Sequence, residues 1–304
     1  MAELWQEPVD LRERDTFYGP WGEQHAPDAH ATYRVVRHKQ HGVNPGLTVS
    51  DPLGREWHVK QAPQPAPKGA EGPIEVVLSR VLSAVGYHQP PVYFVPSFTV
   101  ADAAGTHTER GGRFRLHDQA LKDDGQWSWQ QNPFVGTKPY QGLLVILMIF
   151  NSSDLKNDNN VLYEVKTPRD GVDRWYVVRD LGTALGETGR LNPKRDDPDL
   201  FDHLVFISGV RGGFVEFNYH GWHQELFHHI SPDDVRWASE LLAGLTDRQW
   251  SDAFRAGEYE RAIADRFIRR LHQKIADGQR LGGTFSQPGV LGAQSPHSPP
   301  GPQP

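Results

Sequence analysis

An apolar run followed at once by a dense polar segment is the feature that most constrains this fold. Residues 142–150, GLLVILMIF, are continuously apolar, which is typical of a buried helix and far too short for a membrane span. Residues 151–160 then read NSSDLKNDNN, with two carboxylates and four carboxamides. A surface loop needs polarity but not this density, so the segment is either a dense turn or the holder of a cation.

A hairpin is predicted directly after this polar segment. NVLYEV and RWYVVRD read as strands, and the turn-rich KTPRDGVD joins them. Asp154, Asn159 and Asp180 are then candidates for one site. A hard cation such as Mg²⁺ needs few oxygen ligands from the protein, and a second carboxylate left free can orient or deprotonate a hydroxyl.

The part of the chain before the apolar run reads as a small α+β unit. Two strands are predicted in residues 32–62, with a turn at Asp51–Gly54 that suits a β-turn between paired strands. A helix opening near Pro73 follows, since apolar residues recur at helical spacing up to Val85. Two more strands are predicted before the apolar run, whereas the chain from about Ser231 reads as helices.

The polar segment carries a resemblance to a known superfamily. DLKNDN, residues 154–159, matches the D-L-K-x-x-N of the protein-kinase catalytic loop, and RDLG, residues 179–182, is similar to its D-F-G motif. The spacing also resembles that of the phosphoinositide kinases, and the layout through the hairpin resembles the atypical kinases of the HipA and CotH types. The likeness is to the protein-kinase-like superfamily rather than to one family within it.

The resemblance implies a two-lobed α+β fold. The small N-lobe would be an antiparallel sheet with one helix, and the C-lobe would be mostly helical. The implied divisions are an irregular N-terminal arm (1–32), the nucleotide-binding N-lobe (33–122), the C-lobe with the catalytic loop and metal-binding hairpin (123–281), and a disordered tail (282–304).

The resemblance also implies a role for each candidate residue, with ATP and Mg²⁺ or Mn²⁺ as cofactors. Asp154 would orient or deprotonate the acceptor hydroxyl, and Lys156 would contact the γ-phosphoryl group. Lys60 would bind the α- and β-phosphates and Glu75 would hold it. The backbone amides of Gly42 and Gly46 would cover the phosphates. Asn159 and Asp180 would hold the metal. Asn160 is an alternative metal ligand, because the NN pair leaves the register open by one residue.

The sequence departs from ordinary protein kinases in ways that favour an atypical one. Ser152 and Ser153 replace the His-Arg pair before the catalytic Asp, and no A-P-E motif follows Asp180. We therefore expect a phosphotransferase acting on a hydroxyl, first on a protein and otherwise on a lipid or small molecule. Three alternatives stay open: a nucleotide-binding pseudokinase scaffold, an AMP transferase on the same fold, and a structural protein in which these Asp and Asn residues only form turns and caps.

Composition limits the classes of partner, metal site and location that are expected for this chain. The 304 residues carry a formal charge of −6, so no nucleic-acid partner is expected from the overall field. Cysteine is absent, which excludes disulfides and thiolate metal sites. The N-terminal residues lack a signal-peptide pattern, so we expect a cytoplasmic protein without a transmembrane segment. The histidines of residues 220–229 fit no zinc-binding spacing and are interpreted as ordinary surface or core histidines.

Overall fold

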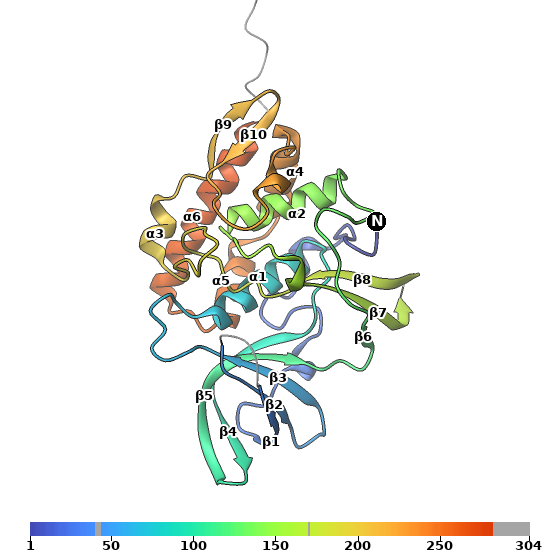
Figure 1. Cartoon of the computed structure of the whole chain (residues 1–304), viewed down its shortest axis with the longest axis vertical. Helices are drawn as coiled ribbons and strands as arrows, with labels where there is room; N and C mark the ends of the chain where they lie inside the picture. Colours follow the sequence, from blue (N-terminus) through green and yellow to red (C-terminus); the bar gives the residue numbers. More distant parts are fainter. Residues whose placement is uncertain (40–43, 170, 282–304) are drawn as a thin grey trace, which may run out of the picture.

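The computed structural model describes residues 1–39, 44–169 and 171–281 and has a mixed α+β fold (Figure 1). The strands are β1 (Thr32–His38), β2 (Gly46–Ser50), β3 (Glu56–Gln61), β4 (Val92–Asp102), β5 (Gly105–Leu116), β6 (Leu121–Asp123), β7 (Asn160–Arg169), β8 (Val172–Val178), β9 (Ile207–Arg211) and β10 (Phe214–Phe217). The α-helices of the described residues are α1 (Glu71–Ala84), α2 (Lys138–Ile149), α3 (Pro198–His203), α4 (Pro232–Ala243), α5 (Asp247–Ala256) and α6 (Arg261–Arg280).

The first five strands form a closed barrel in the order β1-β2-β3-β5-β4. Most neighbours are antiparallel, but β1 pairs with β4 in parallel at Thr32–Arg34. The expectation of a purely antiparallel sheet is therefore wrong, because the long β4–β5 hairpin brings the end of β4 to β1 and this pairing removes both sheet edges. Buried aromatic rings, among them Trp57 and Phe114, fill the barrel in edge-to-face contacts.

Strand β3 shows how the barrel presents polar side chains outside its core. Trp57, Val59 and Gln61 are buried, whereas His58 and Lys60 alternate with them and line a cavity outside the barrel. Successive side chains of a strand point to opposite faces, so the alternation of the sequence sets this division directly.

The helices pack at the other end of the molecule around α2. All but its first residue, Lys138, is buried, and α2 contacts both α4 and α6. The prediction of a buried helix before the polar segment is confirmed. No helix within the described ranges is both long and apolar enough to cross a bilayer.

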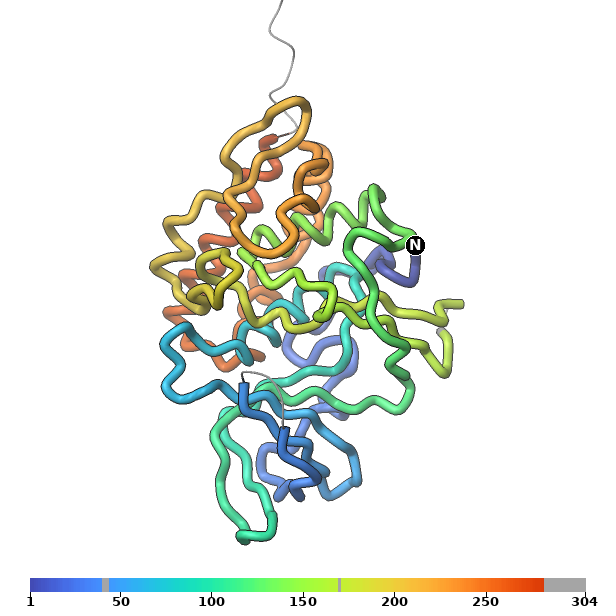
Figure 2. The backbone as a smooth tube through the Cα atoms, in the orientation of Figure 1, coloured from blue at the N-terminus to red at the C-terminus, as the bar shows by residue number. Residues whose placement is uncertain are grey.

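The N-terminal arm runs from the helical end of the molecule to the barrel (Figure 2). Leu4 is buried, and the Gln249 side chain donates to the Leu11 carbonyl at 2.7 Å, which ties the arm to α5. Strand β6 pairs with β7 and ends at Asp123, so it crosses the boundary predicted between residues 122 and 123. The tail predicted for 282–304 lies outside the described residues.

Candidate functional site

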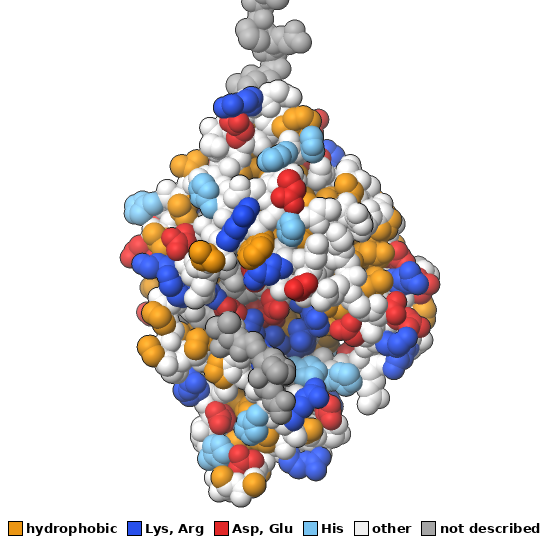
Figure 3. Space-filling model, in the orientation of Figure 1, with side chains coloured by type: hydrophobic (Ala, Val, Ile, Leu, Met, Phe, Trp, Pro, Cys, Tyr) orange, Lys and Arg blue, Asp and Glu red, His pale blue; other side chains and the backbone are white. Residues whose placement is uncertain are grey.

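A cavity of about 880 Å³ lies between the barrel and the helical end. Figure 3 shows basic and acidic side chains gathered around a hollow in the middle of this face. Nine of its lining residues are basic and three are acidic, although the whole chain carries a net charge of −6. The basic residues are Arg37, Lys39, Lys60, Arg113, Arg115, Lys156, Arg179, Arg190 and Arg195, and the acidic ones are Glu71, Asp154 and Asp180. Such a lining favours an anionic ligand.

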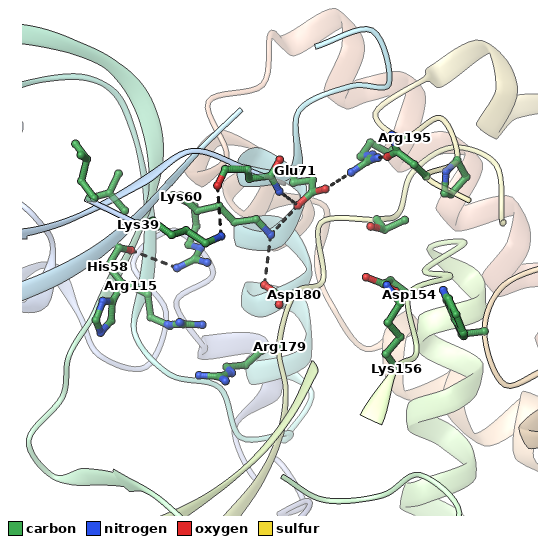
Figure 4. A pocket seen from close by; sticks show the side chains of 18 of the residues that line it. Lys39, His58, Lys60, Glu71, Arg115, Asp154, Lys156, Arg179, Asp180 and Arg195 are labelled. Carbon is green, nitrogen blue, oxygen red and sulfur yellow. Dashed lines mark hydrogen bonds and ion pairs between the residues drawn. The ribbon is translucent and has the colours of Figure 1, made fainter. Parts of the chain in front are cut away.

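Lys60 lines the cavity and contacts three carboxylates, of which Figure 4 labels those of Glu71 and Asp180. Its Nζ is 2.6 Å from Glu71 Oε2, 3.3 Å from Asp180 Oδ1 and 3.7 Å from Glu75 Oε2. Burial lowers the pKa of Lys60, but the three carboxylates outweigh burial and hold the pKa above its usual value. Lys60 is therefore a charged ammonium at neutral pH.

Glu71 contacts Lys60 more closely than the predicted partner Glu75 does. Its Oε2 also accepts from Asn44 Nδ2 at 2.7 Å, and its Oε1 pairs with Arg195. Glu75 Oε1 lies 2.9 Å from Arg113 Nε, while Glu75 Oε2 is buried without a hydrogen bond. The sequence analysis missed Glu71, although it lies four residues before Glu75 and so on the same face of α1.

Asp180 follows β8, and its backbone φ is +54°. Asp adopts this left-handed region more readily than most residues, and the turn directs the carboxylate into the cavity. Burial raises the pKa of Asp180, but the surrounding cations, Lys60 first, outweigh burial and hold the pKa well below its usual range. The carboxylate is therefore ionised and 45% exposed, available to a ligand.

A buried lysine of α6, Lys274, bonds to the start of the loop that carries Asp154. Lys274 Nζ donates to Ile149 O and to Asn151 Oδ1, both at 2.9 Å. Asn151 in turn donates to Gly186 O at 2.8 Å, so one carboxamide links α6 with the segment that follows Asp180. Burial holds the pKa of Lys274 well below its usual value. Lys274 has no sequence signal that distinguishes it from a surface lysine.

Asp154 lines the cavity and pairs with Lys156, whose Nζ is 2.7 Å from Asp154 Oδ1. The Lys156 ammonium also lies 5.1 Å from the centre of the Trp222 ring. Figure 4 shows this pair across the cavity from Lys60 and Asp180. The two acids therefore face the same space from different elements.

Asn159 lies next to Asp180 across the start of the β7–β8 hairpin, since Arg179 N donates to Asn159 O at 2.9 Å. Its Nδ2 donates to Asp154 O at 2.7 Å, which leaves its Oδ1 as the free end of the carboxamide. Asn160 is fully buried and donates to Trp127 O at 3.1 Å. Neither Asn159 nor Asn160 is among the residues that line the cavity.

The two predicted glycines are placed differently. Gly46 is the first residue of β2 and pairs with Lys60 across the sheet, but it does not line the cavity. A Cβ at Gly46 would lie 2.8 Å from Val59 O, so the absence of a side chain allows the strands to approach there. Gly42 lies outside the described residues.

Comparison with known proteins shows a remote structural similarity. No protein-family model and no curated protein sequence matches this chain. The fold is similar to the crystal structure of a Helicobacter pylori proinflammatory kinase, CtkA, with a TM-score of 0.47 and 8% identity. The similarity covers 86% of this chain and 100% of that chain.

Proposed function

We propose that this chain is an ATP- and Mg²⁺-dependent phosphotransferase with a two-lobed, protein-kinase-like fold. It transfers the γ-phosphoryl group to a hydroxyl, with a protein as the first choice of acceptor. The observation that carries the proposal is the contact of Lys60 Nζ with Asp180 Oδ1 at 3.3 Å, between residues 120 apart in sequence. Asp154 lines the same cavity, so the proposed phosphate-binding lysine, the proposed metal-binding Asp180 and the proposed hydroxyl-binding acid border one space.

The donor end of the proposed site is built around Lys60. Its ammonium binds the α- and β-phosphates, and Glu71 and Glu75 hold it in place from the first two turns of α1. The three carboxylates around the ammonium are matched in number by three cations, Lys60 itself with Arg113 and Arg195, so this cluster has no positive charge to spare for a triphosphate. A bound triphosphate would therefore need a cation of its own, and a divalent metal ion supplies it.

Asp180 and Asn159 fit a magnesium ion by their chemistry. The Asp180 carboxylate is exposed in the cavity, and Asn159 has a carboxamide oxygen left after its nitrogen is bonded to the Asp154 carbonyl. When bound, Mg²⁺ or Mn²⁺ would neutralise the charge that develops on the phosphate oxygens. Few protein ligands suffice, since phosphate and water oxygens complete the shell of such an ion. The buried Asn160 is the weaker choice of ligand.

Asp154 performs the acceptor half of the reaction. The acceptor hydroxyl donates its proton to the Asp154 carboxylate, its oxygen forms the new bond to the γ-phosphorus, and the bond to the bridging β-phosphate oxygen breaks to release ADP. Lys156, which pairs with Asp154 at 2.7 Å, turns to the transferring phosphoryl group once a donor is bound. Positioning and charge neutralisation supply most of the rate enhancement.

The test compares γ-labelled and α-labelled ATP with purified full-length protein and a generic protein acceptor. We expect label from the γ-phosphate alone, and its loss in Asp154→Asn and Asp180→Asn. Arg34→Gln is the matched control, because Arg34 is exposed on β1 and does not line the cavity. Label from the α-phosphate would indicate AMP transfer instead. Equal γ-label in wild type and both variants overturns the proposal, and nucleotide binding without any transfer identifies a scaffold.

A further inference from the structure

A second row of polar residues crosses the barrel beside Lys60. Strand register pairs Arg37 of β1 with Thr48 of β2, Thr48 with His58 of β3, and His58 with Arg115 of β5. We call these four residues the His58 row, and all four line the cavity. The Lys60 row, formed by Gly46, Lys60 and Arg113, lies two residues further along the same strands. That spacing separates the two rows by roughly 7 Å.

The cations of the His58 row lack the partners that the Lys60 row has. Within the described residues, no hydrogen bond or ion pair holds the Arg115 guanidinium, although its side chain is partly buried. Among the residues that the structure describes, the exposed Arg37 donates only to the Thr48 hydroxyl, at 3.3 Å. Arg179, which faces the row, contacts the Tyr163 hydroxyl at 3.2 Å and lies 3.9 Å from the exposed carboxylate of Asp123.

Burial first and neighbouring cations second lower the pKa values of both Arg115 and His58. Burial, together with the nearby Arg113 and Arg179, lowers the pKa of Arg115 to about 10. Burial and Arg115 lower the pKa of His58 to about 4, so His58 is neutral at pH 7. A cluster of like charges with no carboxylate in hydrogen-bond contact is unfavourable in the free protein. A bound anion relieves this repulsion.

The cluster is separate from the proposed phosphate site at Lys60. Figure 4 shows Arg115 and Arg179 on the side of Asp180 that lies away from Asp154. The phosphate group that contacts Lys60 cannot also contact the His58 row, roughly 7 Å away, so a ligand that fills both places needs a further phosphate group. The cavity of about 880 Å³ is large enough for a ligand that reaches both places.

We propose that the His58 row and Arg179 form a second anion subsite, which binds a phosphate group distinct from the phosphates at Lys60. Three fork-shaped guanidiniums, those of Arg37, Arg115 and Arg179, beside a hydroxyl and a neutral imidazole match the tetrahedral oxygens of a phosphate. That phosphate belongs either to the ribose end of a nucleotide or to a separate phosphate-bearing ligand. The subsite is a binding site and does not depend on transfer chemistry.

Calorimetric binding to the full chain tests the subsite in a Lys60→Met background, which removes the other phosphate site. The probes are inorganic phosphate, adenosine 5′-monophosphate and adenosine 3′,5′-bisphosphate. We expect phosphate, the bisphosphate or both to bind, at least about tenfold more weakly once Arg115→Gln is added, a difference of about 1.4 kcal/mol. Arg34→Gln, the same chemical change on an exposed part of β1, serves as the matched control and leaves binding unchanged.

The pattern across probes identifies the source of the phosphate. Binding of inorganic phosphate that depends on Arg115 assigns the subsite to a separate phosphate-bearing ligand. A preference for the bisphosphate over the monophosphate that disappears in Arg115→Gln, without binding of free phosphate, assigns it to the nucleotide. The proposal is overturned if none of the three probes binds. It is also overturned if Arg115→Gln and Arg37→Gln, each with unchanged circular dichroism, bind the probes as tightly as the Lys60→Met background does. Loss of phosphoryl transfer alone does not bear on it.

Discussion

The two cross-strand rows above the cavity differ in how their charges are compensated. At the Lys60 row, Lys60 and Arg113 contact Glu71, Glu75 and Asp180 within 4 Å. At the His58 row the guanidiniums contact hydroxyls or nothing within the described residues. The same strands therefore carry a compensated cluster and an uncompensated one. Ion pairs within the protein fix the side chains of the Lys60 row before a ligand binds. The unpaired guanidiniums of the His58 row repel one another, and a bound anion would stabilise them.

The largest effect is expected from removing the Lys60 ammonium of the ion-paired row. Lys60→Met should lower kcat/KM for phosphoryl transfer by about 10²- to 10³-fold, because the phosphate charge that develops in the reaction loses its fixed counter-charge. Steady-state assays with varied ATP measure the change, and Arg34→Gln should keep the wild-type value. A fall of less than about tenfold would show that Lys60 is not the principal phosphate ligand.

The second prediction concerns stability at the same end. Glu75→Gln should lower the free energy of unfolding by about 3 kcal/mol, because it leaves the Arg113 guanidinium, whose side chain is 4% exposed, without its carboxylate. Urea denaturation followed by circular dichroism measures the change.

A double-mutant cycle provides the control for Glu75→Gln. Adding Arg113→Gln should restore part of the loss, because both partners of the buried pair are then neutral. If the two substitutions cost the sum of their separate effects, Glu75 and Arg113 are not coupled and the compensated cluster is smaller than described.

The third prediction is a gain in stability, in contrast to the loss expected at the Lys60 row. Arg115→Gln should raise the free energy of unfolding of the ligand-free protein by about 0.5–1 kcal/mol, because it removes a charge that is repelled by Arg113 and Arg179. The gain should shrink at 1 M salt, where the Debye length falls to about 3 Å. A loss of stability at low salt would mean that Arg115 has a compensating partner after all.

The smallest expected effect is a pH dependence at the uncompensated end. The pKa of His58 is about 4 in the folded protein and about 6.5 in an unfolded chain, so the unfolded state binds more protons between these values. Stability from this group is therefore complete above pH 6.5 and is lost as the pH falls toward 4. As the pH falls through that window, the free energy of unfolding of His58→Gln should rise relative to that of the wild type by a few tenths of a kcal/mol per pH unit. If the difference in free energy of unfolding between wild type and His58→Gln is the same at every pH, the pKa of His58 is not lowered.

Local patterns in the sequence were enough to predict the elements that carry the reactive residues. The apolar run predicted α2, and the strand patterns of residues 32–62 predicted the strand that carries Lys60. The predicted turn at Asp51–Gly54 closes with Gly54 N bonded to Asp51 O at 3.0 Å. These features depend on neighbours within a few residues, so periodicity and turn chemistry describe them well.

The composition of the His58 row was not predictable, because it depends on one irregularity in β1. The register shifts between Val35 and Arg37, so that Arg37 pairs with Thr48. Without this bulge, Val36 would take that place and Arg37 would point to the opposite face. The contact of Glu71 with Arg195 is similarly beyond sequence patterns, since 124 residues separate the two side chains. Long-range pairing of this kind follows from the assembled fold.

The buried lysine of α6 has a consequence for the order in which the chain matures. During synthesis, residues 60–180 emerge from the ribosome long before residue 274, yet the turn at Asn151 that precedes the Asp154 loop is fastened by that later side chain. The turn before the Asp154 loop therefore gains its last contact only when α6 is in place, from a side chain 123 residues further along the chain. The final helix thus completes a part of the cavity wall whose own sequence is made much earlier.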